Sequence, residues 1–262
     1  MTRGAAAASG LLIGLVIGGL GGGGGVLAVP LLVYVLGQSA QDATTGSIVI
    51  VGVTALAGVL ARLRCGSVHW RTGLGLAAAG VPAAALGSLL NQRVAEPVLL
   101  LSFAALTVLA AAAMIADLGP APDVDPPARG AVAVRARPST RAVVGCGLVI
   151  GVLTGYLGVG GGFLLVPALA IGLRMPMRAA VGTSLLVIVV NSVAAFTVRT
   201  GSAADLDWAV LVPFTLTAVL ASFAGRRLAG RMSGVALTRT FAGMLLAVGG
   251  FVAVESVVAL AS

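Results

Sequence analysis

Eight apolar segments dominate this sequence, and most of them are close to 20 residues long. A run of about 20 apolar residues has the length of an α-helix that crosses the hydrocarbon core of a bilayer. Backbone groups have to be paired within that core, which favours helices for such segments. We therefore predict an all-α polytopic membrane protein. The segments cover residues 9–36, 43–61, 72–91, 97–116, 142–173, 179–198, 208–229 and 235–259.

The composition excludes a soluble protein, because only 9% of the 262 residues are charged and 59% are hydrophobic. A soluble domain carries about 25% charged residues. The net charge of +8 comes from basic residues that are all arginine and that lie between apolar segments. Such placement is typical of cytoplasmic loops rather than of a nucleic-acid-binding face. We expect the lipid bilayer, and no nucleic acid, as a partner.

A glycine-rich motif occurs twice in the chain. Residues 18–32 read GGLGGGGGVLAVPLL and residues 155–169 read GYLGVGGGFLLVPAL, with ten of these fifteen positions identical when Pro30 is set against Pro167. A Gly/Pro break repeated in two corresponding apolar segments indicates a substrate site in a membrane transporter.

The correspondence continues beyond the motif. Ser47 aligns with Ser184 at the same offset, and Trp70 aligns with Trp208 after a one-residue insertion. The sequence therefore predicts two membrane repeats of four segments, joined by a polar, proline-rich cytoplasmic linker. The repeats are residues 1–117 and 142–262, and the linker is residues 118–141.

Two topologies fit the segments. If all eight cross the membrane, the arginines divide almost evenly between the two sides. If the first segment of each half enters and returns on the same side, each half crosses three times and the repeats are inverted. Only Arg3, Arg93 and Arg199 then lie outside, and the other arginines, Arg62 among them, lie inside. The positive-inside rule favours this second, re-entrant topology.

The glycine breaks are the candidate binding site. A glycine costs a helix about 1 kcal/mol relative to alanine, and irregular backbone at membrane depth has to be buried in protein or line a wet cavity. Helices that resume after each break would point their N-termini at the site, and such ends attract anions. The alternative is close helix packing. The candidate residues are Gly21, Gly22, Gly23, Gly24, Gly25, Gly158, Gly160, Gly161 and Gly162.

Polar side chains start the segment that follows each break. Ser47 and Thr54 are seven residues apart, as are Ser184 and Asn191, which is about two turns along one helix face. Together with Thr183 they are candidate contacts to a substrate, because polar residues at membrane depth tend to be functional. The alternative is that the hydroxyl groups bond to carbonyls of their own helix.

The sequence resembles the sulfite exporter TauE/SafE family of membrane transporters. The resemblance rests on GYLGVGGGFLLVPAL followed by AAVGTSLLVIVVNS, on GGLGGGGGVLAVPLL followed by DATTGSI, and on the loops that carry Trp70 and Trp208. It implies a multi-pass protein of the bacterial inner membrane that transports a small sulfur-containing or organic anion, such as sulfite or a sulfonate.

No grouping of residues predicts an enzyme, a metal site or a cofactor. His69 stands alone, and no acidic residue lies in the middle of a predicted span. The residues favour a secondary transporter that binds its anion at the midplane. The alternative is an uncoupled, channel-like or accessory protein that passes a reduced sulfur species. The oligomeric state and the direction of transport stay open.

Overall fold

The computed structural model describes most of the chain, and within that part every regular element is helical. The described residues are 2–38, 40–63, 67–91, 94, 96–117, 139–157, 162–198 and 208–261. The longer helices are α1 (Thr2–Leu20), α3 (Ala40–Arg62), α4 (Trp70–Asn91), α5 (Glu96–Ala116), α6 (Thr140–Leu157), α8 (Met177–Val198), α9 (Trp208–Arg231) and α10 (Gly234–Ala261).

The two segments that carry the glycine motif are each divided into a long helix and a short one. After α1 the chain forms a 3₁₀ turn, η1 (Gly22–Gly24), then α2 (Gly25–Pro30), which continues into the π-helical η2 (Leu31–Val35). In the second half, α7 (Gly162–Pro167) continues into the π-helical η4 (Ala168–Gly172). Both π-helical stretches follow directly on a proline, which has no N–H to donate to the helix ladder.

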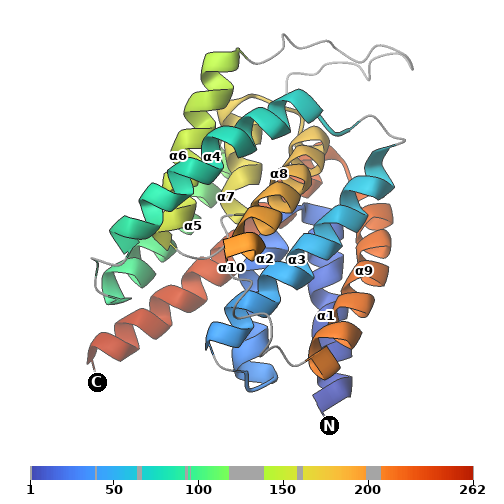
Figure 1. Cartoon of the computed structure of the whole chain (residues 1–262). Helices are drawn as coiled ribbons and strands as arrows, with labels where there is room; N and C mark the ends of the chain where they lie inside the picture. The colour runs from blue at the N-terminus through green and yellow to red at the C-terminus, as the bar shows by residue number, and fades with distance from the viewer. Residues whose placement is uncertain are drawn as a thin grey trace.

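After each long helix the chain turns back along it (Figure 1). A Cβ on Gly24 would lie 3.0 Å from the Ile17 nitrogen and 3.2 Å from the Ile13 carbonyl oxygen, both in α1. In the second half, a Cβ on Gly172 would lie 3.2 Å from the Cys146 sulfur, near the start of α6. The chain after each long helix therefore runs back beside that helix, with Gly24 against the second half of α1 and Gly172 against the start of α6.

The two halves of the chain interlock. Helix α1 packs along α9, and α6, its counterpart in the sequence alignment, packs along α4. Helices α3 and α8 pack against each other, as do α5 and α10 (Figure 1). Each of these contacts joins the first half to the second, so neither half packs as a separate unit.

Two matching glycine stripes allow the close packing of the outer pairs. Glycines at every fourth position of α1 lie against the backbone of α9, and the aligned glycines of α6 lie against α4. Small residues at this spacing let two membrane helices approach closely. The α1 stripe is Gly10, Gly14 and Gly18, and the α6 stripe is Gly147, Gly151 and Gly155.

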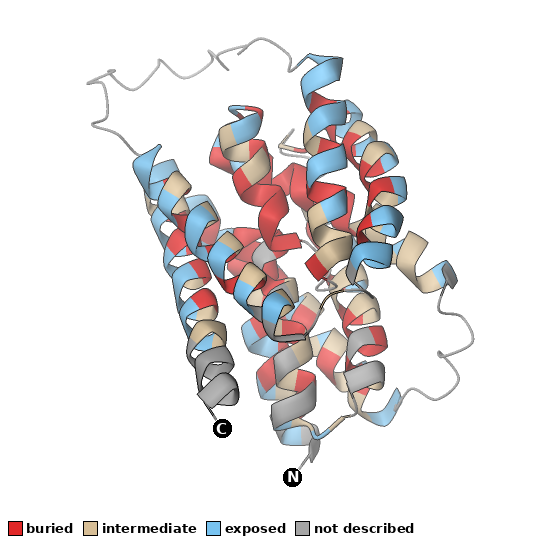
Figure 2. Cartoon of the chain, turned by 90° about the vertical axis from the view of Figure 1, so that its left-hand side faces the viewer, coloured by how far each residue is buried: buried red, intermediate tan, exposed pale blue. Residues whose placement is uncertain are grey.

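The chain has the length and surface of a polytopic membrane protein. Within the described residues, six helices are long and apolar enough to cross a bilayer, namely α3, α4, α6, α8, α9 and α10. Their outer faces expose large apolar side chains such as Leu86 of α4 and Leu220 of α9. Buried residues concentrate in the short α7 and in the first half of α8, inside the bundle (Figure 2). The predicted all-α membrane fold is confirmed.

Candidate functional site

The two glycine breaks meet inside the protein. A Cβ on Gly22 would overlap the Gly162 carbonyl oxygen, and a Cβ on Gly162 would lie 2.7 Å from the Gly22 carbonyl oxygen. Each position therefore needs glycine for the two backbones to touch. The contact joins η1 of the first half to α7 of the second.

Gly21 gives the first break its sharp turn and brings it against α8. Its φ of 78° and ψ of −128° are readily adopted only by glycine. A Cβ here would lie 2.8 Å from the Ser184 Oγ and 3.2 Å from the Val181 carbonyl oxygen. The Ser184 hydroxyl donates to that same Val181 carbonyl over 2.9 Å. The buried Ser184 hydroxyl therefore lies directly beside the Gly21 backbone, which carries no side chain.

The remaining candidate glycines have different surroundings. Gly25 faces Val51 of α3, with 3.6 Å from its Cβ position to the nearest Val51 methyl. Gly24 packs on α1 and has a structural reason to be glycine. Gly23 lies within the 3₁₀ turn. The predicted residues Gly158, Gly160 and Gly161 lie outside the described part of the chain.

Helices α3 and α8 cross beside the breaks in opposite directions. A Cβ on Gly52 would lie 2.8 Å from the Ser192 Cβ, and one on Gly58 would lie 3.0 Å from a Leu185 methyl. Thr54 lies between the two contact positions of α3, and Asn191 lies between those of α8. The crossing therefore places both of these candidate polar residues in one region.

Thr54 and Asn191 each bury a polar atom without a partner. The Thr54 Oγ1 and the Asn191 Oδ1 have no hydrogen bond within the described residues, and Thr54 is fully buried. A buried polar atom left unpaired costs about 1–3 kcal/mol. The two atoms lie at aligned positions of the two halves, and native interiors leave few buried polar atoms unpaired.

Two further predicted polar residues, Thr183 and Ser47, are buried in α8 and α3. Thr183 is fully buried, and its Oγ1 accepts a hydrogen bond of 3.2 Å from the His69 backbone N–H. This bond ties the segment before α4 to α8. Ser47 is buried near the start of α3, where its neighbour Gly46 faces Leu211 of α9. Neither contact brings Thr183 or Ser47 to the Gly22–Gly162 junction.

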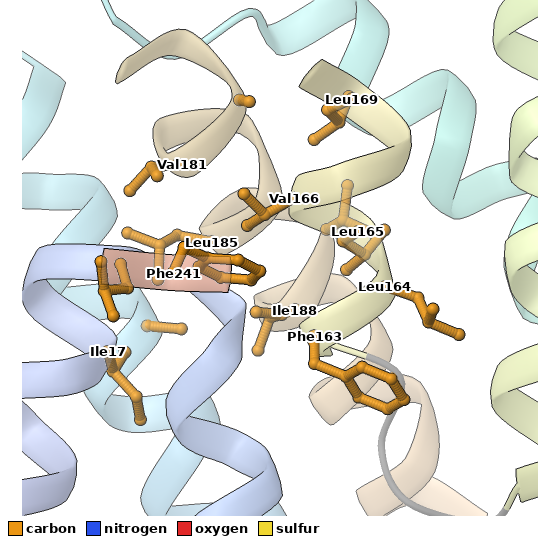
Figure 3. Packing of buried hydrophobic residues seen from close by; sticks show 14 of the residues in the cluster. Ile17, Phe163, Leu164, Leu165, Val166, Leu169, Val181, Leu185, Ile188 and Phe241 are labelled. Carbon is orange, nitrogen blue, oxygen red and sulfur yellow. The ribbon is translucent and has the colours of Figure 1, made fainter. Parts of the chain in front are cut away.

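Apolar side chains close the region around the breaks. All six residues of α7 are buried, and Figure 3 shows Phe163, Val166 and Ile188 packed beside one another. The Phe163 ring meets Phe103 of α5 edge-on, with ring centroids 5.1 Å apart and planes at 65°. Apolar side chains therefore surround the α7 side of the junction, and in such surroundings hydrogen bonds and charges have strong effects.

A buried arginine is the residue that sequence reasoning placed incorrectly. Arg62 counts as a loop charge when only apolar segments are considered, yet it is the last residue of α3 and only 6% exposed. Its Nη2 donates to the Gly18 carbonyl oxygen of α1 over 2.5 Å. The available signal was its alignment with Arg199 at the same offset as Ser47 with Ser184.

Broken helices that meet inside a bundle of membrane spans are typical of membrane transporters. The sequence matches the family described as sulfite exporter TauE/SafE over residues 6–252. The chain therefore belongs to the TauE/SafE family and is a multi-pass transporter of the bacterial cell membrane. This family membership indicates a transporter rather than an enzyme.

Two curated relatives cover nearly the whole chain. Proteins of Xylella fastidiosa strains 9a5c and Temecula1, each described as a probable membrane transporter protein, are 34% identical over 244 residues. The aligned region covers 92% of this chain and 90% of each relative. No solved structure matches the chain significantly.

Replacing Gly21 by alanine is expected to lower the free energy of unfolding by about 1–3 kcal/mol. The substitution would force an L side chain into backbone that favours glycine and would press a methyl group on Ser184. Thermal unfolding in detergent measures the effect. Gly243→Ala on α10 is the control, because nothing lies within 4 Å of its Cβ position. Equal stability of the two variants would contradict the strain at Gly21.

Proposed function

We propose that this transporter carries a small sulfur-containing or organic anion, bound where the two glycine breaks meet. The observation that carries the proposal is the contact of Gly22 with Gly162, with the Ser184 hydroxyl beside the first break. Backbone at a glycine break can be approached closely by a ligand. Its N–H groups are neutral donors, and the Ser184 hydroxyl would become one by releasing the Val181 carbonyl. Neutral donors suit an oxyanion that has to bind and then leave.

Two inverted repeats, residues 1–117 and 142–262, form this site in our proposal. The packing of α1 on α9 is repeated by the packing of α6 on α4. The contact of Gly25 with Val51 is repeated by that of Gly162 with Ile188, at the same alignment offset. Such paired contacts support a pseudo-twofold relation between the halves, with the Gly22–Gly162 junction near its axis.

The fold-back of each broken segment supports the re-entrant topology. Gly24 lies beside Ile13 in the second half of α1, and Gly172 lies beside Cys146 near the start of α6, so the chain after each break runs back along its long helix. Each half would then cross the membrane three times, and the second half would have the opposite orientation to the first. The arginine distribution favours the same arrangement.

The unpaired polar atoms support a binding role for the α3–α8 crossing. The amide N–H₂ of Asn191 and the hydroxyl of Thr54 can donate to an anion, and a bound anion would offset part of the cost of burying the Thr54 hydroxyl. The unpaired Asn191 Oδ1 is an acceptor and would need a donor on the substrate, such as a protonated oxygen. Thr54, Asn191 and Ser184 are therefore the side chains we propose beside Gly21, Gly22 and Gly162. Ser47 is retained as a proposed contact, and Thr183 is a weaker one, since its hydroxyl accepts a hydrogen bond from the His69 backbone N–H.

Thermal stability of the purified protein in detergent tests the substrate class. Sulfite, thiosulfate, sulfoacetate, taurine, sulfate and chloride are compared at equal ionic strength. A ligand present at 100 times its Kd stabilises the folded state by about 2.7 kcal/mol. We expect a shift with one or two sulfur anions and none with chloride. Shifts of equal size with every anion, or with none, would contradict the proposed site.

Counterflow in liposomes separates a carrier from a passive pore. Substrate loaded inside should accelerate entry of labelled substrate if the site faces one side at a time. Entry that is unaffected by the internal substrate would instead support the uncoupled, channel-like alternative.

A further inference from the structure

Several hydroxyl groups in these helices donate to a carbonyl of their own helix. Those of Thr107, Thr215 and Ser222 reach a carbonyl oxygen three or four residues earlier, at 2.9 or 2.7 Å. Such bonds are the ordinary way to satisfy a hydroxyl inside a helix. Thr54 of α3 departs from this pattern, because it is fully buried and its Oγ1 has no hydrogen-bond partner within the described residues.

Thr54 lies on the face of α3 that contacts the first glycine break. Val51, three residues earlier, has a methyl group 3.6 Å from the Cβ position of Gly25, the first residue of α2. Residues three apart are neighbours on one helix face. The unpaired hydroxyl of Thr54 is therefore the next polar group along the face that covers this break.

Asn191 holds the corresponding place in the second half. Ile188, three residues earlier in α8, has its Cδ1 atom 3.2 Å from the Cβ position of Gly162, the first residue of α7. The Asn191 Oδ1 is buried and has no partner within the described part of the chain. The antiparallel contacts of α3 with α8 put Thr54 and Asn191 within about one turn of each other along the two helices.

The two unpaired atoms need different partners. An amide oxygen only accepts hydrogen bonds, whereas a hydroxyl both donates and accepts. A halide or a fully deprotonated oxyanion has no hydrogen to donate, so it can satisfy Thr54 but leaves the Asn191 oxygen unpaired. An anion that also carries an O–H or N–H group can satisfy both. A buried acceptor that stays unpaired weakens binding roughly 5- to 150-fold.

We propose that this site selects anions that carry a hydrogen-bond donor, with the Asn191 Oδ1 as the acceptor and the Thr54 hydroxyl as a donor to an anionic oxygen. The inference rests on the function proposed above and names the class of sulfur anion. That class comprises hydrogen sulfite, which keeps one proton, and sulfonates with a hydroxyl or amino group. Sulfate and simple alkylsulfonates are rejected, just as a site built to bind a substrate hydroxyl rejects the analogue that lacks it.

Two pairs of anions, matched in charge and closely matched in shape, test this selection. Sulfamate carries an amino group where methanesulfonate carries a methyl group, and isethionate differs from ethanesulfonate by one hydroxyl. Each is added to the purified protein in detergent, and its apparent Kd is taken from the thermal shift. In at least one pair, we expect the donor-bearing anion to bind at least about fivefold more tightly.

The outcomes separate this inference from the proposed function. Equal Kd values within both pairs, or no shift with either donor-bearing anion, would overturn the selection and leave the proposed function standing. If none of the sulfur anions compared for the proposed function shifts the protein either, both proposals are overturned.

Asn191→Leu tests whether the amide is the selecting group. The variant should bind both members of a pair more weakly and with similar apparent Kd values, because the acceptor is gone. Thr107→Val is the matched control, since its hydroxyl is paired within α5, and it should keep the wild-type preference. An Asn191→Leu protein that also keeps this preference would overturn the role of Asn191.

A cation is the other species that unpaired side-chain oxygens can bind in a transporter. Thermal stability is therefore compared in sodium chloride and in choline chloride, without any sulfur anion. We expect no difference between the two salts. Stabilisation by sodium alone that is lost in Asn191→Leu would assign the Asn191 oxygen to a cation and overturn the inference.

Discussion

Replacing Gly151 by leucine is expected to prevent the chain from reaching a folded, monodisperse state in detergent. A Cβ at this position would overlap the Gly80 carbonyl oxygen of α4 and lie 2.8 Å from the Ala83 Cβ. Backbone cannot move aside without separating α4 from α6. Over-packing of a core costs about 1–3 kcal/mol and sometimes more, and a whole leucine against backbone belongs at the upper end. Size-exclusion profiles and yield after extraction measure the result.

Gly145→Leu on the same helix is the control for this experiment. Nothing lies within 4 Å of its Cβ position, so leucine there should leave yield and unfolding temperature unchanged. Gly14 occupies the aligned position in α1, where a Cβ would overlap the Ala218 backbone of α9. Gly14→Leu should therefore repeat the defect of Gly151→Leu. A monodisperse Gly151→Leu protein with wild-type stability would show that the close α4–α6 contact is wrong.

Replacing Asn191 by leucine is expected to abolish most transport while leaving the fold intact. Its Oδ1 is buried without a hydrogen-bond partner in the described structure, so an apolar side chain of similar size removes a cost rather than a contact. A hydrogen bond to a charged group contributes about 1.5–3 kcal/mol, so its loss should reduce kcat/KM roughly 10- to 150-fold. Uptake of the labelled anion into liposomes and thermal unfolding of the same preparation give the two readings.

Thr107→Val provides the opposite pattern as a control. Thr107 is fully buried in α5, and its hydroxyl donates to the carbonyls of Phe103 and Ala104 over 2.9 Å each. Valine should cost about 1 kcal/mol of stability there and leave transport normal. Thr54→Val should behave like Asn191→Leu, with a smaller loss of transport. If Asn191→Leu unfolds more easily yet transports normally, Asn191 serves the fold and not the substrate.

Local features of the sequence were sufficient to predict the helices. The apolar segments 43–61 and 72–91 became α3 (Ala40–Arg62) and α4 (Trp70–Asn91), within three residues at each end. In the first half the glycine run interrupts the segment at Gly21–Gly24, because glycine destabilises a helix and readily adopts turn conformations. Breaks and boundaries are decided by neighbouring residues, and these are visible in the sequence.

The partners of each helix could not be predicted in the same way. That α1 packs on α9, far along the chain, depends on the glycine stripes of the helices and on the fit of distant side chains. The spacing of Gly10, Gly14 and Gly18 predicts a close contact between helices, but it does not identify the partner helix. Arg62 was assigned to a loop because its burial follows from the position of α1, which the sequence of α3 does not contain.

The interlocking of the two halves has a consequence for how the protein is made. The ribosome delivers α1 first and its partner α9 almost last, so α1 enters the bilayer with its glycine face uncovered. Helix α4 is likewise synthesised before its packing partner α6. The first half on its own would present two small-residue faces to lipid or to other newly inserted helices. Assembly of this transporter is therefore a late event, completed only when the second half has been inserted and both pairs can close together.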